Sequence, residues 1–104
     1  MLKGIIIQNE VKSAKGYEPK EILNEEYCAV IINDVEGIIY LWVGDNSNVI
    51  DRFKAARLAQ MLNWKIFGGA ARVVQDKSEI HRVLTKYARI DEEIPPTELK
   101  LILG

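Results

Sequence analysis

Residues with reactive side chains are scarce in this sequence of 104 residues. It contains one cysteine, Cys28, and one histidine, His81, which excludes a disulfide framework and a multi-cysteine metal site. Cys28 lies in the apolar run YCAVII, so we expect a buried, packed thiol. His81 lies in the helical pattern SEIHRVLTKY, and we expect an ordinary helix residue there. No nucleophile–base pair is evident, and no enzymatic activity is expected.

The sequence also lacks long apolar runs and any charge imbalance. Its apolar runs are far shorter than the roughly 18 to 20 residues of a membrane span, and the three isoleucines after Gly4 are too few for a signal peptide. With 28% charged residues and a net charge of −1, nothing favours nucleic acid or an anionic membrane as partner. The 48% hydrophobic content fits a single globular domain over residues 1–104, expected in the cytoplasm.

A phosphate-binding loop is not expected either. The pair Gly68–Gly69 is the nearest approach to one, but no Lys-Ser/Thr follows it, and the G-x-G-x-x-G spacing is missing. The pair also follows a helical pattern, whereas a phosphate loop precedes its helix. We therefore interpret it as a flexible connection.

Apolar runs predict three strands in the first half of the chain. Residues 1–8 form the first, and the β-branched runs at residues 27–33 and 38–44 form a hairpin of strands buried on both faces. Residues 9–26 between them are polar and contain Gly16 and Pro19, so a loop with one helical turn near residues 20–23 is predicted.

The second half of the chain is predicted to contain two helices and one strand. A long helix spans about residues 47–63, capped by Asp45, Asn46 or Ser47 and ended by Asn63. A strand at residues 71–75 precedes a shorter helix at 76–87, capped by Asp76 or Ser78. One face of this helix is apolar and comprises Ile80, Val83, Leu84 and Tyr87.

The tail, residues 89–104, is split by two prolines. Residues 99–103 are apolar and could form a closing strand or pack on a partner. The order of elements predicts an α+β fold, in which helices cover a mixed sheet.

The long helix has two apolar faces where one would suffice for a core. Projected at about 100° per residue, the first consists of Ala55, Leu58, Ala59 and Leu62, with Asp51 at its start. The second side is apolar with two interleaved polar residues and comprises Val49, Ile50, Phe53, Arg57, Gln60 and Met61. An exposed patch of this kind marks a partner site, unless the tail or the N-terminal loop covers it.

The stretch YCAVIINDVEGIIYLWVGDNSNVIDRFKAARLAQMLN resembles the centre of a gelsolin-like repeat, as found in gelsolin, villin and severin. The matching features are a strand ending IIN, a strand ending IYLWVG, a polar turn and a long helix, in that order. ARVVQDKSEIHRVLTKY resembles the next strand and short helix of the family, so the likeness spans about residues 18–87.

The resemblance implies a five-stranded mixed β-sheet sandwiched between one long and one short α-helix. It also implies an actin-binding protein that regulates filament assembly, with the long helix docked in the barbed-end cleft of an actin subunit. The second apolar face would then be the contact surface. The single repeat suggests an early member, of archaeal type, that binds actin without severing filaments.

The resemblance further implies a Ca²⁺ site. Counted from the glycine of WVG, the helix carboxylate of the family falls on Asp51, and a one-residue shift brings Glu26 to the strand position. Asp51 could instead pair with a Lys or Arg, or accept hydrogen bonds from the edge of the sheet. A second site shared with actin is not expected, because Asn63 stands where a carboxylate is needed.

A second hypothesis keeps the fold and changes the partner. The domain would be a protein–protein interaction module in a scaffold, a traffic or GTPase-regulator assembly, or a homodimer, without binding actin.

Overall fold

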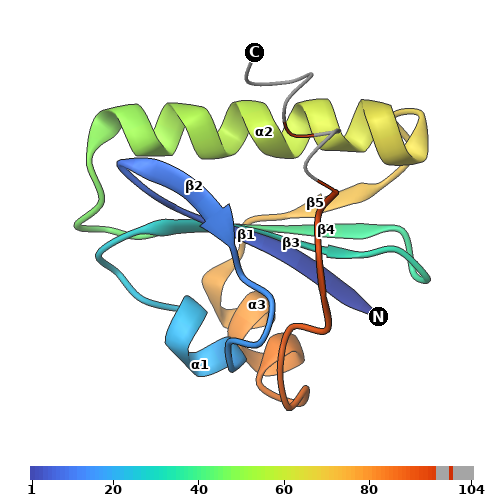
Figure 1. The fold of residues 1–104 in the computed structure, drawn as a ribbon, viewed down its shortest axis with the longest axis horizontal. Coiled ribbons are helices and arrows are strands. Elements are labelled where there is room, and N and C mark those ends of the chain that lie inside the picture. Colours follow the sequence, from blue (N-terminus) through green and yellow to red (C-terminus); the bar gives the residue numbers. More distant parts are fainter. Residues whose placement is uncertain (96–98, 100–104) are drawn as a thin grey trace.

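A mixed β-sheet forms the middle layer of the molecule, with one long helix on one face and two short helices on the other (Figure 1). The computed structural model describes residues 1–95 and residue 99. In chain order the elements are β1 (Leu2–Gln8), β2 (Glu10–Ser13), α1 (Pro19–Ile22), β3 (Cys28–Asn33), β4 (Ile38–Val43), α2 (Val49–Phe67), β5 (Arg72–Val74), α3 (Lys77–Leu84) and β6 (Glu92–Glu93).

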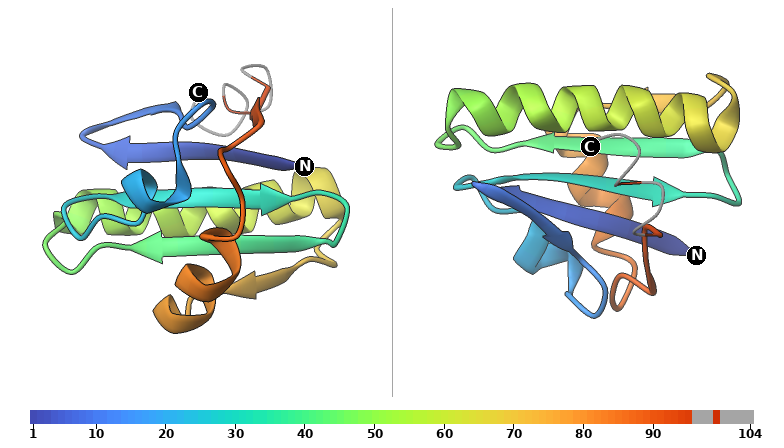
Figure 2. Two further views of the ribbon diagram at one scale, coloured as in Figure 1. Left: turned by 90° about the horizontal axis from the view of Figure 1, so that it is seen from below. Right: turned by 45° about the horizontal axis from the view of Figure 1, so that its top comes forward.

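The strands are ordered β2-β1-β3-β4-β5, and β6 pairs with β1. The β1–β2, β1–β3 and β3–β4 pairs are antiparallel, whereas β4–β5 and β1–β6 are parallel. The α2 helix runs along the sheet, close to β3 and β4 (Figure 2). The fold class predicted from the sequence, with a mixed sheet between a long and a short helix, is confirmed.

The central strands bury both of their faces, so two separate apolar cores form. Side chains of β1, β3 and β4 alternate between them, because successive residues of a strand point to opposite faces. The core under α2 contains Ile5, Ile7, Val30, Ile32, Ile39, Leu41, Ala55, Leu58, Ala59 and Leu62. The core against α1 and α3 contains Leu2, Ile6, Ile22, Ala29, Ile31, Tyr40, Trp42, Ile80 and Leu84.

Two strands were not predicted from the sequence. Residues 10–13 lie in the stretch predicted as a loop, yet they pair with β1 as β2. Their side chains are polar and mostly exposed, so apolar periodicity could not reveal this edge strand. The two-residue β6 is too short to leave a pattern. The alternative of a closing strand at residues 99–103 lies outside the described residues except for Leu99, which packs against the core under α2.

The prediction that the long helix ends at Asn63 is wrong. Asn63 lies within α2, and its side chain accepts a hydrogen bond from the backbone N–H of Ala71 at 2.9 Å. The helix continues to Phe67 and ends at Gly68, whose φ of 60° is a left-handed conformation that glycine adopts freely. Over residues 1–95 and 99, neither this helix nor any other combines the length and apolar character needed to cross a lipid bilayer.

The shorter helix forms as predicted but ends at Leu84, three residues before the predicted end, so Tyr87 lies just after it. Asp76 caps α3 by accepting the backbone N–H of Glu79 at 2.9 Å. The predicted apolar face of α3 packs on the core, with Ile80 and Leu84 buried and Val83 and Tyr87 partly buried. His81 is exposed on this helix, as expected of an ordinary surface residue.

The docking of α2 depends on its buried leucines. We expect Leu58→Ala to lower the free energy of unfolding by about 2–5 kcal/mol, because it removes apolar contacts and leaves a cavity under the helix. Urea denaturation measures the change. Val35→Ala is the matched control, since Val35 is 80% exposed; equal stability losses in the two variants would contradict this account of the core.

Candidate functional site

Gly44 fixes where the chain leaves β4 toward α2. A Cβ at this position would lie 2.4 Å from the carbonyl oxygen of Tyr27 and 2.5 Å from that of Glu25, so no other residue fits. The Gly44 N–H donates to the Tyr27 carbonyl at 3.2 Å, and the Asn46 N–H donates to the Glu25 carbonyl at 2.8 Å. The glycine of the WVG motif therefore locks the turn before α2 against the segment before β3.

The turn then delivers Asn48, which caps α2. Its side-chain oxygen accepts the backbone N–H of Asp51 at 2.8 Å, so the cap is one residue later than predicted from Asp45, Asn46 or Ser47. Ser47 is 7% exposed and turned inward instead. Its hydroxyl donates to the Gly44 carbonyl at 2.6 Å and accepts from the thiol of the buried Cys28 at 3.4 Å.

Asp51 joins the first turn of α2 to the β1–β2 turn. Its two carboxylate oxygens lie 3.2 and 3.1 Å from the backbone N–H of Asn9, and one accepts the Asn48 side-chain amide at 3.0 Å. Asn9 adopts a left-handed φ of 65° in that turn. Asp51 is 2% exposed, so these hydrogen bonds satisfy a buried carboxylate. The predicted alternative in which Asp51 hydrogen-bonds the edge of the sheet is the arrangement observed.

Lys77, the first residue of α3, binds the same turn from the other face of the sheet. Its Nζ lies 2.5 Å from Glu25 Oε1, 2.8 Å from Asp45 Oδ1 and 4.9 Å from the centre of the Trp42 ring. Burial alone would lower the pKa of Lys77, but hydrogen bonds to Asp45 and Glu25 outweigh it and raise that pKa. The hydrogen bond from Lys77 in turn lowers the pKa of both Glu25 and Asp45.

The second apolar face of α2 is exposed to solvent. Phe53 is 73% exposed, Ile50 72%, Val49 64% and Met61 38%. Arg57 and Gln60, which lie among them, are exposed too. Neither the N-terminal loop nor the described part of the tail covers these side chains, so the face predicted from the sequence is open to a partner.

Trp64 belongs to this face but was missed by the sequence prediction, which ended the helix at Asn63. It follows Phe53 by eleven residues, about three helical turns, and so lies on the same side of α2. It is 67% exposed. Continuing the helical projection past Asn63 to the glycine pair would have revealed it.

The described contacts of Asp51 are hydrogen bonds from N–H donors. Both of its carboxylate oxygens accept from Asn9 or Asn48, and Ca²⁺ would need further oxygen ligands beside them. Glu26 is exposed, and its carboxylate accepts the side-chain amide of Asn46 at 3.0 Å. No group of three or more His, Cys, Asp or Glu side chains suited to a metal is found among residues 1–95 and 99.

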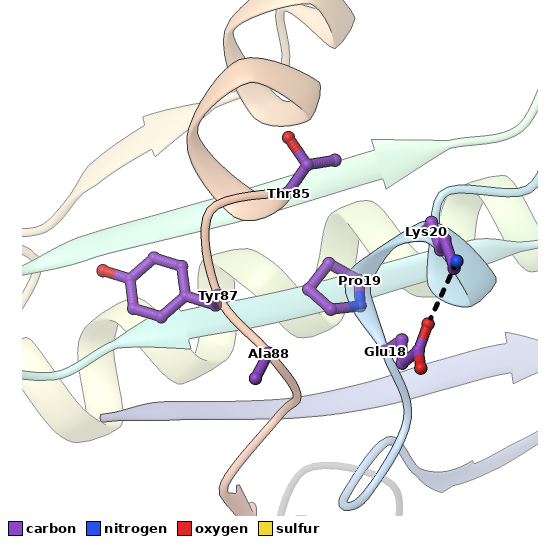
Figure 3. A pocket seen from close by; sticks show the side chains of 6 residues that line it. All are labelled: Glu18, Pro19, Lys20, Thr85, Tyr87 and Ala88. Atoms are coloured by element: carbon purple, nitrogen blue, oxygen red, sulfur yellow. Dashed lines mark ion pairs between the residues drawn. The ribbon is translucent and has the colours of Figure 1, made fainter.

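Shallow hollows lie on the surface of the described residues, and two of them adjoin the elements discussed above. One, of about 290 Å³, lies between α1 and the segment after α3 and is lined by Glu18, Pro19, Lys20, Thr85, Tyr87 and Ala88 (Figure 3). Within it, the Lys20 ammonium group forms an ion pair with the Glu18 carboxylate at 3.4 Å. The other, of about 370 Å³, lies at the start of α2 beside Val49 and Ile50. Neither brings together a catalytic set of side chains.

Solved structures share this arrangement of helices and strands. The crystal structure of the Thorarchaeota ProGel/rabbit actin complex contains a chain that matches 100% of this chain over 100% of its own length, with a TM-score of 0.56 and 18% sequence identity. The fold is gelsolin-like. The Thorarchaeota 2DGel3/rabbit actin complex matches 72% of this chain over 39% of its own, with a TM-score of 0.54 and 14% identity.

At these identities the likeness concerns the gelsolin-like fold, as the YLWVG motif and the helix after it predicted. No protein-family model matches the sequence, and no curated protein matches it.

The ion pairs of Lys77 make stability depend on pH. The folded pKa values of Glu25 and Asp45 are lowered, so their stabilisation is present above the unfolded values near about 4 and is lost as the pH falls through the folded values. We expect Lys77→Met to lower the thermal midpoint at pH 7, and the difference from wild type to shrink as the pH falls below about 4 and through the lowered folded pKa values. Thermal denaturation across this range measures it. If the thermal midpoints of wild type and Lys77→Met still differ at low pH, the stabilisation comes from the packing of Lys77 on Trp42 and not from its ion pairs.

Asp51 provides a test of the metal question. Asp51→Asn places an amide donor against the N–H groups of Asn9 and Asn48, so we expect a loss of about 1–3 kcal/mol in unfolding free energy. The loss should be equal with added Ca²⁺ and with chelator, and Glu26→Gln should have little effect in either. Ca²⁺ that stabilises the wild type but not the Asp51 variant would contradict the hydrogen-bonding role and indicate a metal site.

Proposed function

We propose that this protein binds actin through the exposed face of α2 and thereby regulates filament assembly. Two proteins that share its fold were crystallised in complex with rabbit actin, and one of them matches the whole chain. The observation that best supports actin binding is the exposed apolar face of α2. A chain of this size has no need of it for its own core, because α2 is already docked through its opposite side.

The chemistry of this face suits insertion into an apolar groove. Burying an exposed Val, Ile or Phe side chain yields about 1.5–3 kcal/mol each, whereas association costs about 4–15 kcal/mol in lost freedom. Several apolar side chains on one helix face are therefore needed, and Val49, Ile50 and Phe53 provide them within the first two turns. This is recognition of a groove by the apolar face of a helix.

Polar side chains on the same face would set the orientation of the complex. Arg57 and Gln60 lie between Phe53 and Met61 and are exposed. Such polar groups at the rim of an apolar contact select a partner and a register more than they add affinity. Arg57 presents five donors that can pair with a carboxylate of the partner.

We also propose that binding needs no Ca²⁺ held by this chain. In the calcium-dependent alternative implied by the resemblance, Asp51 and Glu26 would be the ligands. The hydrogen bonds of Asp51 to Asn9 and Asn48 already order the start of α2, so the helix needs no cation to present its apolar face.

A single face of this kind engages one actin subunit. We propose a cytoplasmic, non-enzymatic actin-binding protein that acts on subunits entering or leaving a filament. Severing is not expected of one chain, because it requires several linked contacts.

Phe53→Asp tests the proposal. A carboxylate at the centre of the apolar contact would be buried without a partner, so we expect actin affinity to fall at least about tenfold. The measurement is polymerisation of pyrene-labelled actin, with Ca²⁺ and with chelator, with actin kept in one nucleotide and cation state.

The matched control is Val35→Asp, which changes an exposed apolar residue outside α2. It should act on actin as the wild type does. No effect of the wild type on polymerisation in either buffer would overturn the proposal. If the wild-type protein without actin sediments as a dimer, and Phe53→Asp sediments as a monomer, the face mediates self-association instead.

A further inference from the structure

The exposed apolar side chains of α2 form two clusters. The N-terminal cluster comprises Val49, Ile50 and Phe53, and the C-terminal cluster comprises Met61 and Trp64. Phe53 and Trp64 are eleven residues apart on one side of the helix, which corresponds to about 16 Å along its axis. A partner seated on the first cluster and following the helix therefore reaches the second.

The exposed ring of Trp64 lies beside the backbone of Gly69. A methyl group on Gly69 would lie 3.3–3.4 Å from three carbons of the indole ring, so one edge of the ring lies on the backbone of the residue after the helix end. Gly69 has a φ of 88°, which lets the chain fold back beneath the ring. An aromatic side chain has only two side-chain torsions, so it loses little freedom when a partner covers it.

The two tryptophans of the chain have opposite environments. Trp42 is 4% exposed and donates its indole N–H to the Asn24 carbonyl at 2.8 Å, so both its ring and its donor are satisfied within the core. Trp64 is 67% exposed, and no hydrogen bond of its side chain is found among the described residues. Its apolar surface has no function within the described part of the fold, and tryptophan is enriched among residues that dominate binding interfaces.

The charge of α2 argues against a second copy of this chain as the occupant. The helix carries four basic residues, Arg52, Lys54, Arg57 and Lys65, and one acidic residue, the buried Asp51, although the whole chain has a net charge of −1. Two such helices placed face to face would repel each other. The face fits an apolar groove with an acidic rim on a different protein.

We propose that Trp64 is a second anchor for the actin subunit that binds the N-terminal cluster, so that the contact extends along the whole of α2. This inference rests on the proposed function. Trp64 contacts the partner with the exposed part of its ring, Gly69 lies along one edge of that ring, and Arg57 and Gln60 lie between the two clusters.

The test compares the actin affinity of Trp64→Ala, Trp64→Phe and Lys65→Ala with wild type. We expect about a 30-fold loss for Trp64→Ala, a smaller loss for Trp64→Phe, and little change for the neighbouring Lys65→Ala. Thermal midpoints of all three should stay close to wild type, because these side chains are exposed.

A direct readout comes from ¹⁹F NMR of protein labelled with 5-fluorotryptophan. The Trp64 resonance, assigned by its absence in Trp64→Phe, should change its chemical shift when monomeric actin is added, and the Trp42 resonance should keep its own. Wild-type affinity in Trp64→Ala with an unshifted Trp64 resonance would overturn this inference and leave the proposed function standing. Absence of actin binding by the wild type would overturn both.

Discussion

The position of α2 depends on one close approach between two backbone segments. At Gly44 the chain passes so near the carbonyl groups of Glu25 and Tyr27 that a single added carbon would collide with them. This contact places the turn after β4 against the segment before β3. The residues that begin and orient α2 follow directly after this turn. The cap at Asn48 and the buried hydroxyl of Ser47 both lie in the five residues after this point.

Charged and polar groups then hold this turn from both faces of the sheet. On one side Asp51 receives hydrogen bonds from the β1–β2 turn and from Asn48. On the other, Lys77 joins α3 to Glu25 and Asp45. These contacts have different environments, because Asp51 is nearly inaccessible to solvent whereas Asp45 is exposed. The buried hydrogen bonds are therefore expected to carry more of the local stability than the ion pairs at the surface.

The sequence predicted the elements that are marked by an apolar run or by regularly spaced apolar residues, and it was less accurate at the ends of the long helix. The buried β3–β4 hairpin, the two faces of α2 and the capped α3 were all evident from spacing alone. The cap at Asn48 and the role of Asn63 were not, because several polar residues near each helix end were equally suited to them. Whether the carboxylate of Asp51 meets N–H donors or a cation depends on the distant Asn9, which no local pattern reveals.

Two small residues on the buried side of α2 affect how fast a complex would form. Ala55 and Ala59 are almost inaccessible and let the helix backbone lie close to the sheet, so the helix is already docked before a partner arrives. No segment of this helix has to fold as a partner arrives. The association rate is then governed by diffusion and mutual orientation, typically about 10⁵–10⁷ M⁻¹ s⁻¹ for docking of preformed surfaces. Differences in affinity among partners would then come mainly from differences in the dissociation rate of each complex.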